Sequence, residues 1–268
     1  MKIKTVTAIF FSPSGGTERA ATALRDLLAE KLDTDKGSLD LTLPGSRAGE
    51  YSFKEDELVI LAAPTYAGRV PNKIMPDLKR ILDFGGSPAA AIATFGNRSP
   101  GSALDELMEI LREKGARVMG GMAMVTRHAF SEIIASDRPD KRDMEDLASF
   151  AGLIAGKVMK DDPEETVPEE VGPYYRPLKE DGTPAVFLKA SPVVDVDLCI
   201  GCGTCREVCP MGSVSEDVSI TSGPCIKCQA CIRKCPAGAR YFDDPDFLSH
   251  VRMLEKNYTK RSENIIRI

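Results

Sequence analysis

The sequence predicts an α/β protein in which a doubly wound, five-stranded parallel sheet is followed by a second, small α+β domain. Two observations lead to this fold class. Short apolar runs alternate with amphipathic stretches through residues 1–160, which is typical of strand–helix units around a parallel sheet. All eight cysteines lie later, between Cys199 and Cys235, in a block too small to account for a chain of 268 residues.

The first domain, residues 1–160, is expected to contain five strands with helices between them. The strands are predicted at Thr5–Phe11, Ser38–Leu43, Leu58–Ala62, Ala89–Thr94 and Arg117–Val125. The helices, whose apolar residues recur at helical spacing, are predicted at Thr17–Leu32, Asn72–Leu82, Ser102–Lys114 and Lys141–Met159. This order of elements favours the strand order 2-1-3-4-5 of a doubly wound sheet.

The composition changes after this domain. Residues 161–190 are rich in Pro, Glu and Gly and are predicted to be a linker, although Tyr175 and Phe187 indicate that it packs on a neighbouring surface. Residues 191–243 hold the cysteines in two similar halves, which form an internal repeat. Residues 244–268 have apolar residues at helical spacing and are expected to form a C-terminal helix and a tail.

The cysteines form two runs with the same spacing, Cys-x2-Cys-x2-Cys-x3-Cys-Pro. The first run contains Cys199, Cys202, Cys205 and Cys209, and the second contains Cys225, Cys228, Cys231 and Cys235. This is the bacterial ferredoxin spacing, in which three cysteines of a run bind one cubane and the fourth binds the other. We therefore expect two [4Fe–4S] clusters, one held by Cys199, Cys202, Cys205 and Cys235, the other by Cys209, Cys225, Cys228 and Cys231.

Disulfides and structural zinc are the alternatives for these cysteines. Disulfides suit small secreted chains, but cysteines two residues apart pair poorly, and the apolar run at Thr5–Phe11 has strand length and lacks a signal-peptide cleavage site. Zinc needs four ligands, usually from two Cys-x2-Cys pairs, so the third cysteine and the Cys-Pro ending of each run would have no role. The spacing therefore favours iron–sulfur clusters.

A loop of small residues follows the first predicted strand and opens the first helix. It contains Ser12, Ser14, Gly15, Gly16 and Thr17. Hydroxyl groups and backbone N–H groups at a helix N-terminus bind phosphate. The spacing resembles the flavodoxin fingerprint for the phosphate of FMN and is neither a Walker loop nor a dinucleotide turn. A helix cap without a ligand is the alternative.

Two further loops are expected at the same edge of the sheet. The loop after the third strand contains Pro64, Thr65, Tyr66, Ala67 and Gly68, and the loop after the fourth contains Thr94, Phe95, Gly96, Asn97 and Arg98. Because the carboxyl ends of parallel strands meet at one edge, these loops are predicted to lie with the Ser12–Thr17 loop, beside the switch point where ligands bind.

These segments resemble those of fused flavodoxin–ferredoxin proteins, known as the EFR1 family of ferredoxins. The resemblance extends over nearly the whole chain and includes His128–Ser131 and Arg138–Asp140. It implies a flavodoxin-like, FMN-binding domain followed by a 2[4Fe–4S] ferredoxin-like domain.

The resemblance also implies roles for the loop residues. The Ser12–Thr17 loop would hold the FMN phosphate, Tyr66 and Gly68 would line the flavin ring, and Thr94, Gly96 and Asn97 would lie on its other side. The chain has no Trp, so the usual aromatic sandwich is incomplete and one flavin face is expected to be open. His128 is expected to be solvated or bonded to the backbone rather than to act as an acid.

Charge and composition exclude several partners. A net charge of −5 provides no basic field for nucleic acid or anionic lipid, and no apolar stretch is long enough to span a membrane. A cytoplasmic location in an anaerobe is expected, since a reducing interior suits exposed clusters. Redox proteins are the expected partners, and a second copy of the chain, in a homodimer, is a further candidate.

The expected function is electron transfer between the two clusters, FMN and external redox partners. The chain shows no acid–base constellation and no nicotinamide motif, so the redox chemistry is expected to belong to the cofactors. An FMN-dependent reductase of a small molecule and a redox or oxygen sensor are the alternatives. An open flavin face favours the first alternative, and the second predicts an effector domain that the sequence does not contain.

Overall fold

The computed structural model describes residues 2–163 and 170–268. Its main sheet has the order β10-β7-β6-β4-β1-β2, with every pair parallel except β10–β7. The strands of this sheet are β1 (Thr5–Phe10), β2 (Asp35–Asp40), β4 (Glu57–Pro64), β6 (Pro88–Phe95), β7 (Arg117–Val125) and β10 (Ile265–Arg267). The five parallel strands confirm the predicted order 2-1-3-4-5, which is that of flavodoxin-like folds.

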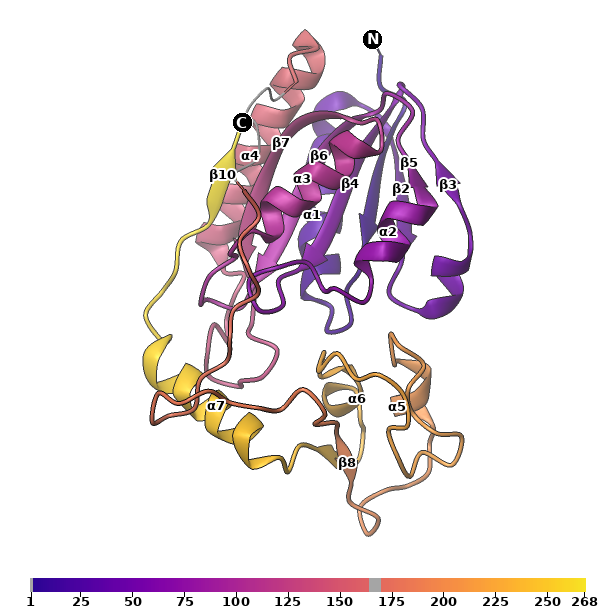
Figure 1. Cartoon of the computed structure of the whole chain (residues 1–268). Coiled ribbons are helices and arrows are strands. Elements are labelled where there is room, and N and C mark those ends of the chain that lie inside the picture. Colours follow the sequence, from indigo (N-terminus) through magenta and orange to yellow (C-terminus); the bar gives the residue numbers. More distant parts are fainter. Residues whose placement is uncertain (1, 164–169) are drawn as a thin grey trace.

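Helices cover both faces of the sheet (Figure 1). The helices are α1 (Gly16–Leu32) and α4 (Lys141–Lys160) on one face and α2 (Met75–Ile81) and α3 (Ala103–Glu113) on the other. Strand residues alternate between the two layers: Leu58 and Ile60 of β4 pack under α1 and α4, whereas Val59 and Leu61 pack on the opposite side. Both sides of the strands are therefore buried, as expected for a parallel sheet.

The structure differs from the sequence prediction at both edges of the sheet. Strand β2 starts at Asp35, three residues before the predicted Ser38. The prediction began too late because most residues of this strand are exposed, so its hydrophobic pattern is weak. Strand β10 was not predicted; it pairs antiparallel with β7 and adds a sixth strand. Short additional elements are η1 (Pro44–Ala48), β3 (Tyr51–Ser52) and β5 (Leu82–Asp83).

The cysteine region is a small α+β unit below the carboxyl edge of the main sheet (Figure 1). Its elements are β8 (Val193–Val194), α5 (Thr204–Glu207), α6 (Ala230–Arg233) and β9 (Arg240–Tyr241), with β8 and β9 paired antiparallel. Helix α7 (Pro245–Asn257) follows, capped by the side chain of Asp244, which accepts from the backbone N–H of Phe247. The tail then returns along the sheet domain to β10.

Two buried or half-buried arginines connect the cysteine unit to the sheet domain. Arg47 in η1 donates to the carbonyl of Pro210 at 2.5 Å, next to Cys209, while its Nε pairs with Asp77 at 3.0 Å. Arg233 in α6 donates to the carbonyl of His128 at 2.8 Å. Each arginine thus donates a hydrogen bond across the junction, which helps to fix how the two units sit.

No helix among the described residues is long and apolar enough to cross a membrane. Of the predicted linker, residues 161–190, the structure describes 161–163 and 170–190, and residues 164–169 lie outside the described part of the chain.

Candidate functional site

The structure gathers the eight cysteines around two small cavities. The cluster-1 cavity is lined by Cys199, Cys202, Cys205 and Cys235, and the cluster-2 cavity by Cys209, Cys225, Cys228 and Cys231. Each group takes three cysteines from one run and the fourth from the other, which is the grouping that crossed ligation requires. In the described part of the chain, no three His, Cys, Asp or Glu side chains are arranged around a single metal ion; the ligands of a cubane bind four different irons and stand further apart.

In the cluster-2 cavity Cys228 is buried, and Cys209, Cys225 and Cys231 are partly buried. Burial raises the pKa of Cys228 and Cys231 to about 12. A thiolate in such surroundings needs a compensating positive charge, which bound iron supplies. Three backbone N–H groups donate to sulfurs of the two groups over 3.3–3.4 Å: Ser213 to Cys209, Ala239 to Cys235 and Lys227 to Cys225. Hydrogen bonds of this kind tune cluster potential.

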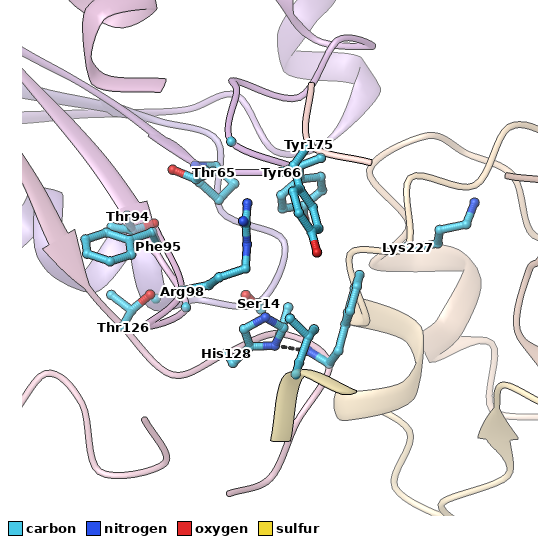
Figure 2. Close-up of a pocket in the computed structure, with 18 of the residues that line it drawn as sticks. Ser14, Thr65, Tyr66, Thr94, Phe95, Arg98, Thr126, His128, Tyr175 and Lys227 are labelled. Atoms are coloured by element: carbon cyan, nitrogen blue, oxygen red, sulfur yellow. Dashed lines mark hydrogen bonds between the residues drawn. The ribbon is translucent and has the colours of Figure 1, made fainter. Parts of the chain in front are cut away.

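A larger cavity, of about 230 Å³, lies at the carboxyl edge of the sheet (Figure 2). The loops after β1, β4, β6 and β7 form one side of it. The other side comes from the linker, from Ile226 and Lys227 of the second cysteine run, and from His250 and Leu254 of α7. The cavity is therefore built by both domains, next to the point between β1 and β4 where the strand order reverses. We call it the composite cavity.

Most of the predicted flavin-site residues line the composite cavity. They are Ser14, Gly16, Thr17, Pro64, Thr65, Tyr66, Ala67, Gly68, Thr94, Phe95, Gly96 and Arg98. Ser12, Gly15 and Asn97 do not line it. The hydroxyl of Ser12 accepts from the backbone N–H of Glu18 at 2.9 Å, so it caps α1. Gly15 has φ +86° and supplies the turn that brings Gly16 and Thr17 to the cavity.

Asn97 binds the C-terminal tail. Its Nδ2 donates to the carbonyls of Tyr258 at 2.7 Å and Lys260 at 2.9 Å, and its Oδ1 accepts from the N–H of Ser262 at 3.0 Å. All its side-chain hydrogen-bonding groups therefore have partners in the protein. The structure places Asn97 as the residue that holds the chain between α7 and β10, not at the cavity wall.

The composite cavity is suited to an anionic, partly polar ligand. The described residues that line it include no Asp or Glu, while Arg98 lines it without a carboxylate partner among them. The guanidinium of Arg98 stacks on the ring of Tyr175, 3.8 Å from the ring centroid. The hydroxyl of Thr65 is buried and has no hydrogen-bond partner. An orphaned buried hydroxyl at a cavity wall fits a ligand that bonds to it.

These features fit FMN. The Ser14–Thr17 turn at the start of α1 presents N–H groups and hydroxyls to a phosphate. The Thr17 and Thr94 hydroxyls lie 2.7 Å apart, so one donates to the other and both are held at the carboxyl edge. The aromatic and apolar walls supplied by Tyr66, Tyr175 and Leu254 match a flat ring system.

His128 is a neutral side chain at the cavity wall. Its Nδ1 accepts from the backbone N–H of Phe130 at 3.1 Å, so Nε2 carries the proton. Burial lowers its pKa to about 4, and the charges of His250, Arg233 and Arg98 act in the same direction. The ring packs against Gly96, where a Cβ atom would lie 2.4 Å from His128 Cδ2. The backbone bond expected from the sequence is present, and Gly96 is required by this contact.

Tyr66, in the wall of the composite cavity, lies near the cysteines of the cluster-2 cavity. Burial raises its pKa well above 10, and the charges of Cys228 and Cys225 raise it further. Tyr66 therefore stays protonated and close to two cluster-2 cysteines. The loop that carries it is bound by the linker, because the N–H of Tyr175 donates to the carbonyl of Ala67 at 2.8 Å.

Two parts of the cavity wall were not predicted as part of the site. On the sheet side this is the loop after β7, Thr126–Phe130. The opposite side comprises Tyr175, Pro177 and Phe187 in the linker, Ile226 and Lys227, and His250 and Leu254. Thr126–Phe130 could have been predicted as site residues, because they follow the fifth strand and so lie at the same edge of the sheet as the other loops. The aromatic residues of the linker indicated packing, but no local feature of the sequence identifies the surface on which they pack. Nothing in the local sequence marks Ile226 or His250 as cavity residues.

Comparison with known protein families finds two matches, both in the cysteine region. Residues 192–215 and 222–238 each match a family model described as a 4Fe-4S binding domain. No curated protein matches the chain.

Solved structures with some similarity to the chain include several flavodoxins. One, from Streptococcus pneumonia TIGR4, is 20% identical, with 57% of this chain and 99% of that chain covered and a TM-score of 0.41. Another, from the domain Archaea, is 21% identical, with 58% and 99% covered and a TM-score of 0.41. Flavodoxin 2 from Bacillus cereus is 18% identical, with 57% and 99% covered and a TM-score of 0.41.

The two matched segments contain all eight cysteines, four in each. With the strand order described above, they show a chain in which a flavodoxin-like α/β fold is fused to a ferredoxin-like region that supports two [4Fe–4S] clusters.

Proposed function

We propose that this chain is an electron-transfer iron–sulfur flavoprotein that passes electrons between external redox proteins, two [4Fe–4S] clusters and FMN in the composite cavity. One observation carries the proposal. Ile226 and Lys227, which stand between two cysteines of the cluster-2 cavity, line the same cavity as the flavodoxin-like loops. Two redox sites that share a wall suit direct electron exchange within one chain.

The proposal assigns a role to each group of residues. Cys199, Cys202, Cys205 and Cys235 hold cluster 1, and Cys209, Cys225, Cys228 and Cys231 hold cluster 2. The backbone and hydroxyls of Ser14–Thr17 bind the FMN phosphate, Tyr66 and Tyr175 pack on the ring, and Thr65 and Arg98 bind its polar edge. Bound FMN supplies chemistry in steps of one or two electrons, which matches two one-electron clusters.

Cluster 1 is proposed as the contact point for the external partner. Cys202 is exposed, and so are the apolar Val196 and Ile200 in the segment that precedes it, at 76% and 69%. Cys228, at the equivalent position of the second run, is buried. A partner that docks over Cys202 would reach cluster 1 first, so electrons would pass between the partner and FMN through clusters 1 and 2 in sequence.

Cluster 1 is expected to be lost before cluster 2 under mild oxidation, because oxidants reach Cys202 more easily than Cys228. Limited ferricyanide treatment, followed by iron analysis and electron paramagnetic resonance, measures this order. The Cys202→Ser and Cys228→Ser variants assign the two signals. Simultaneous loss, or earlier loss of the signal that Cys228→Ser removes, would contradict the proposed exposure of cluster 1.

The function itself is tested by anaerobic reconstitution and rapid mixing. We expect about eight irons and one FMN per chain, in keeping with two [4Fe–4S] sites and one flavin site. After a one-electron donor reduces the clusters, flavin bleaching should follow at a rate that does not depend on protein concentration. A rate proportional to protein concentration would place the exchange between chains, and absence of flavin or of iron would reject the flavoprotein.

The reductase alternative depended on an open flavin face. Tyr175 and Phe187 of the linker and His250 and Leu254 of α7 line the composite cavity on the side away from the sheet, so protein covers the side that an open flavin face would leave free. This arrangement supports a carrier over a small-molecule reductase.

A further inference from the structure

The two cysteine runs are an internal repeat, and they differ at two positions where the backbone is left-handed. The first run has glycines there, Gly201 with φ +67° and Gly203 with φ +78°. The second run has Lys227 with φ +58° and Gln229 with φ +66°. A side chain in this conformation costs free energy that glycine avoids. Lys227 and Gln229 are therefore held in a backbone conformation that is strained for residues with a side chain. Strain of this kind concentrates at functional positions.

Lys227 connects the cluster-2 loop to the linker. Its Nζ donates to the carbonyl of Leu188 at 2.8 Å and to that of Cys225 at 3.2 Å, and it contributes to the wall of the composite cavity. Gln229 braces this arrangement, because its Nε2 donates to the carbonyl of Lys227 at 3.2 Å. Leu188 directly follows Phe187, another wall residue. The two strained residues therefore fix the part of the linker that closes the cavity.

Ile226 and Arg233 also differ in environment from their repeat partners. Ile226 packs against the core of the sheet domain, whereas Ile200, at the same position of the first run, is 69% exposed. Arg233 donates to the carbonyls of His128 at 2.8 Å and Ala129 at 2.9 Å, and so holds the loop after β7. Its repeat partner is the exposed Glu207.

Each of these wall contacts comes from the segment between Cys225 and Cys235, three of whose cysteines line the cluster-2 cavity. The loop conformation at Lys227 and Gln229 is unfavourable alone, so it needs the surrounding bonds to persist. Ligation of Cys225, Cys228 and Cys231 to one cluster would supply them. The corresponding cluster-1 loop lines no part of the composite cavity.

We propose that cluster 2 completes the FMN site, so that assembly of cluster 2 and FMN affinity are coupled, while cluster 1 is not part of this coupling. The inference rests on the proposed function, since it takes FMN as the ligand of the composite cavity. Because coupling between two binding events is reciprocal, FMN should also protect cluster 2 against loss.

The first test measures FMN affinity by quenching of flavin fluorescence in anaerobically reconstituted full-length protein. Cys228→Ser, which removes a cluster-2 ligand, should raise the dissociation constant at least about tenfold, within the usual range of coupling between sites. Cys202→Ser, at the equivalent position of the first run, should change it less than about twofold. Equal effects of the two substitutions would overturn the proposal.

The second test keeps both clusters and removes the contacts that transmit the coupling. Lys227→Gly gives the second run the residue that the first run has at Gly201, so all eight irons should remain while FMN affinity falls. Arg233→Gln should act in the same direction, and Glu207→Gln is its matched control. Retention of wild-type FMN affinity in both Lys227→Gly and Arg233→Gln would overturn the coupling.

Failure of the proposed function is distinguishable from failure of this inference. If the wild-type protein with eight irons does not bind FMN, the proposed flavin site is wrong. If the wild-type protein binds FMN and the Cys228→Ser variant binds it equally well, the flavin site stands and the coupling is wrong.

Discussion

Replacement of Asp143 by asparagine is expected to lower the free energy of unfolding by about 3–5 kcal/mol, the usual cost of leaving one member of a buried ion pair without its partner. The Asp143 side chain is fully buried and pairs through both oxygens with Arg138, which is 3% exposed. Asp143 also accepts from Asn264 Nδ2 at 2.8 Å and from the N–H of Asp140 at 2.8 Å. The substitution removes the negative charge that compensates the buried Arg138. It also weakens the contact between Asp143 and Asn264, which holds the C-terminal tail.

The neighbouring Arg142 provides a matched control. It pairs with Glu263 at 3.0 Å and so also connects α4 to the tail, but the two side chains are 61% and 57% exposed. Arg142→Ala should change the free energy of unfolding by no more than about 1 kcal/mol. Urea denaturation under anaerobic conditions measures both variants, and hydrogen exchange at β10 reports tail release. Equal effects of the two substitutions would show that Asp143 is not the centre of this network.

The sheet could be predicted because strands that are buried on both faces appear in the sequence as continuous apolar runs. Arg117–Val125 was located without error, since all but its first residue are buried. Strand β2 was placed late because an exposed edge strand carries little hydrophobic pattern. Strand β10 could not be found, because its pairing depends on contacts such as that between Asn264 and the N–H of Val125, 139 residues away.

The candidate site shows the same division between local and long-range information. The cysteine groups and the loops after β1, β4 and β6 follow from spacing and from strand order. The family resemblance implied that Asn97 lies beside the flavin, yet its side chain binds the tail. Nothing in the local sequence marks Arg47 or Arg233 as junction residues, because the carbonyls that accept from them, those of Pro210 and His128, lie far away along the chain.

Acidification below about pH 6.5 is expected to destabilise the protein through His128, whose pKa is lowered to about 4. In the unfolded chain His128 takes up a proton near its ordinary pKa of about 6.5, whereas the folded protein resists protonation. Stability is therefore complete above pH 6.5 and falls as the pH moves toward 4. Between pH 6.5 and 5 the loss should be about 2 kcal/mol.

The groups around His128 explain why the folded protein excludes the proton. The wall of the composite cavity buries the ring, and Arg98 and Arg233, together with His250 when it is protonated, disfavour a further positive charge there. His128→Gln should remove this part of the pH dependence, because glutamine stays neutral. Denaturation midpoints of the wild-type and His128→Gln proteins at pH 7.5 and pH 5 measure the difference. An equal loss of stability in both proteins would show that other groups cause the acid sensitivity. It would also contradict the conclusion that the fold holds His128 neutral beside the proposed flavin.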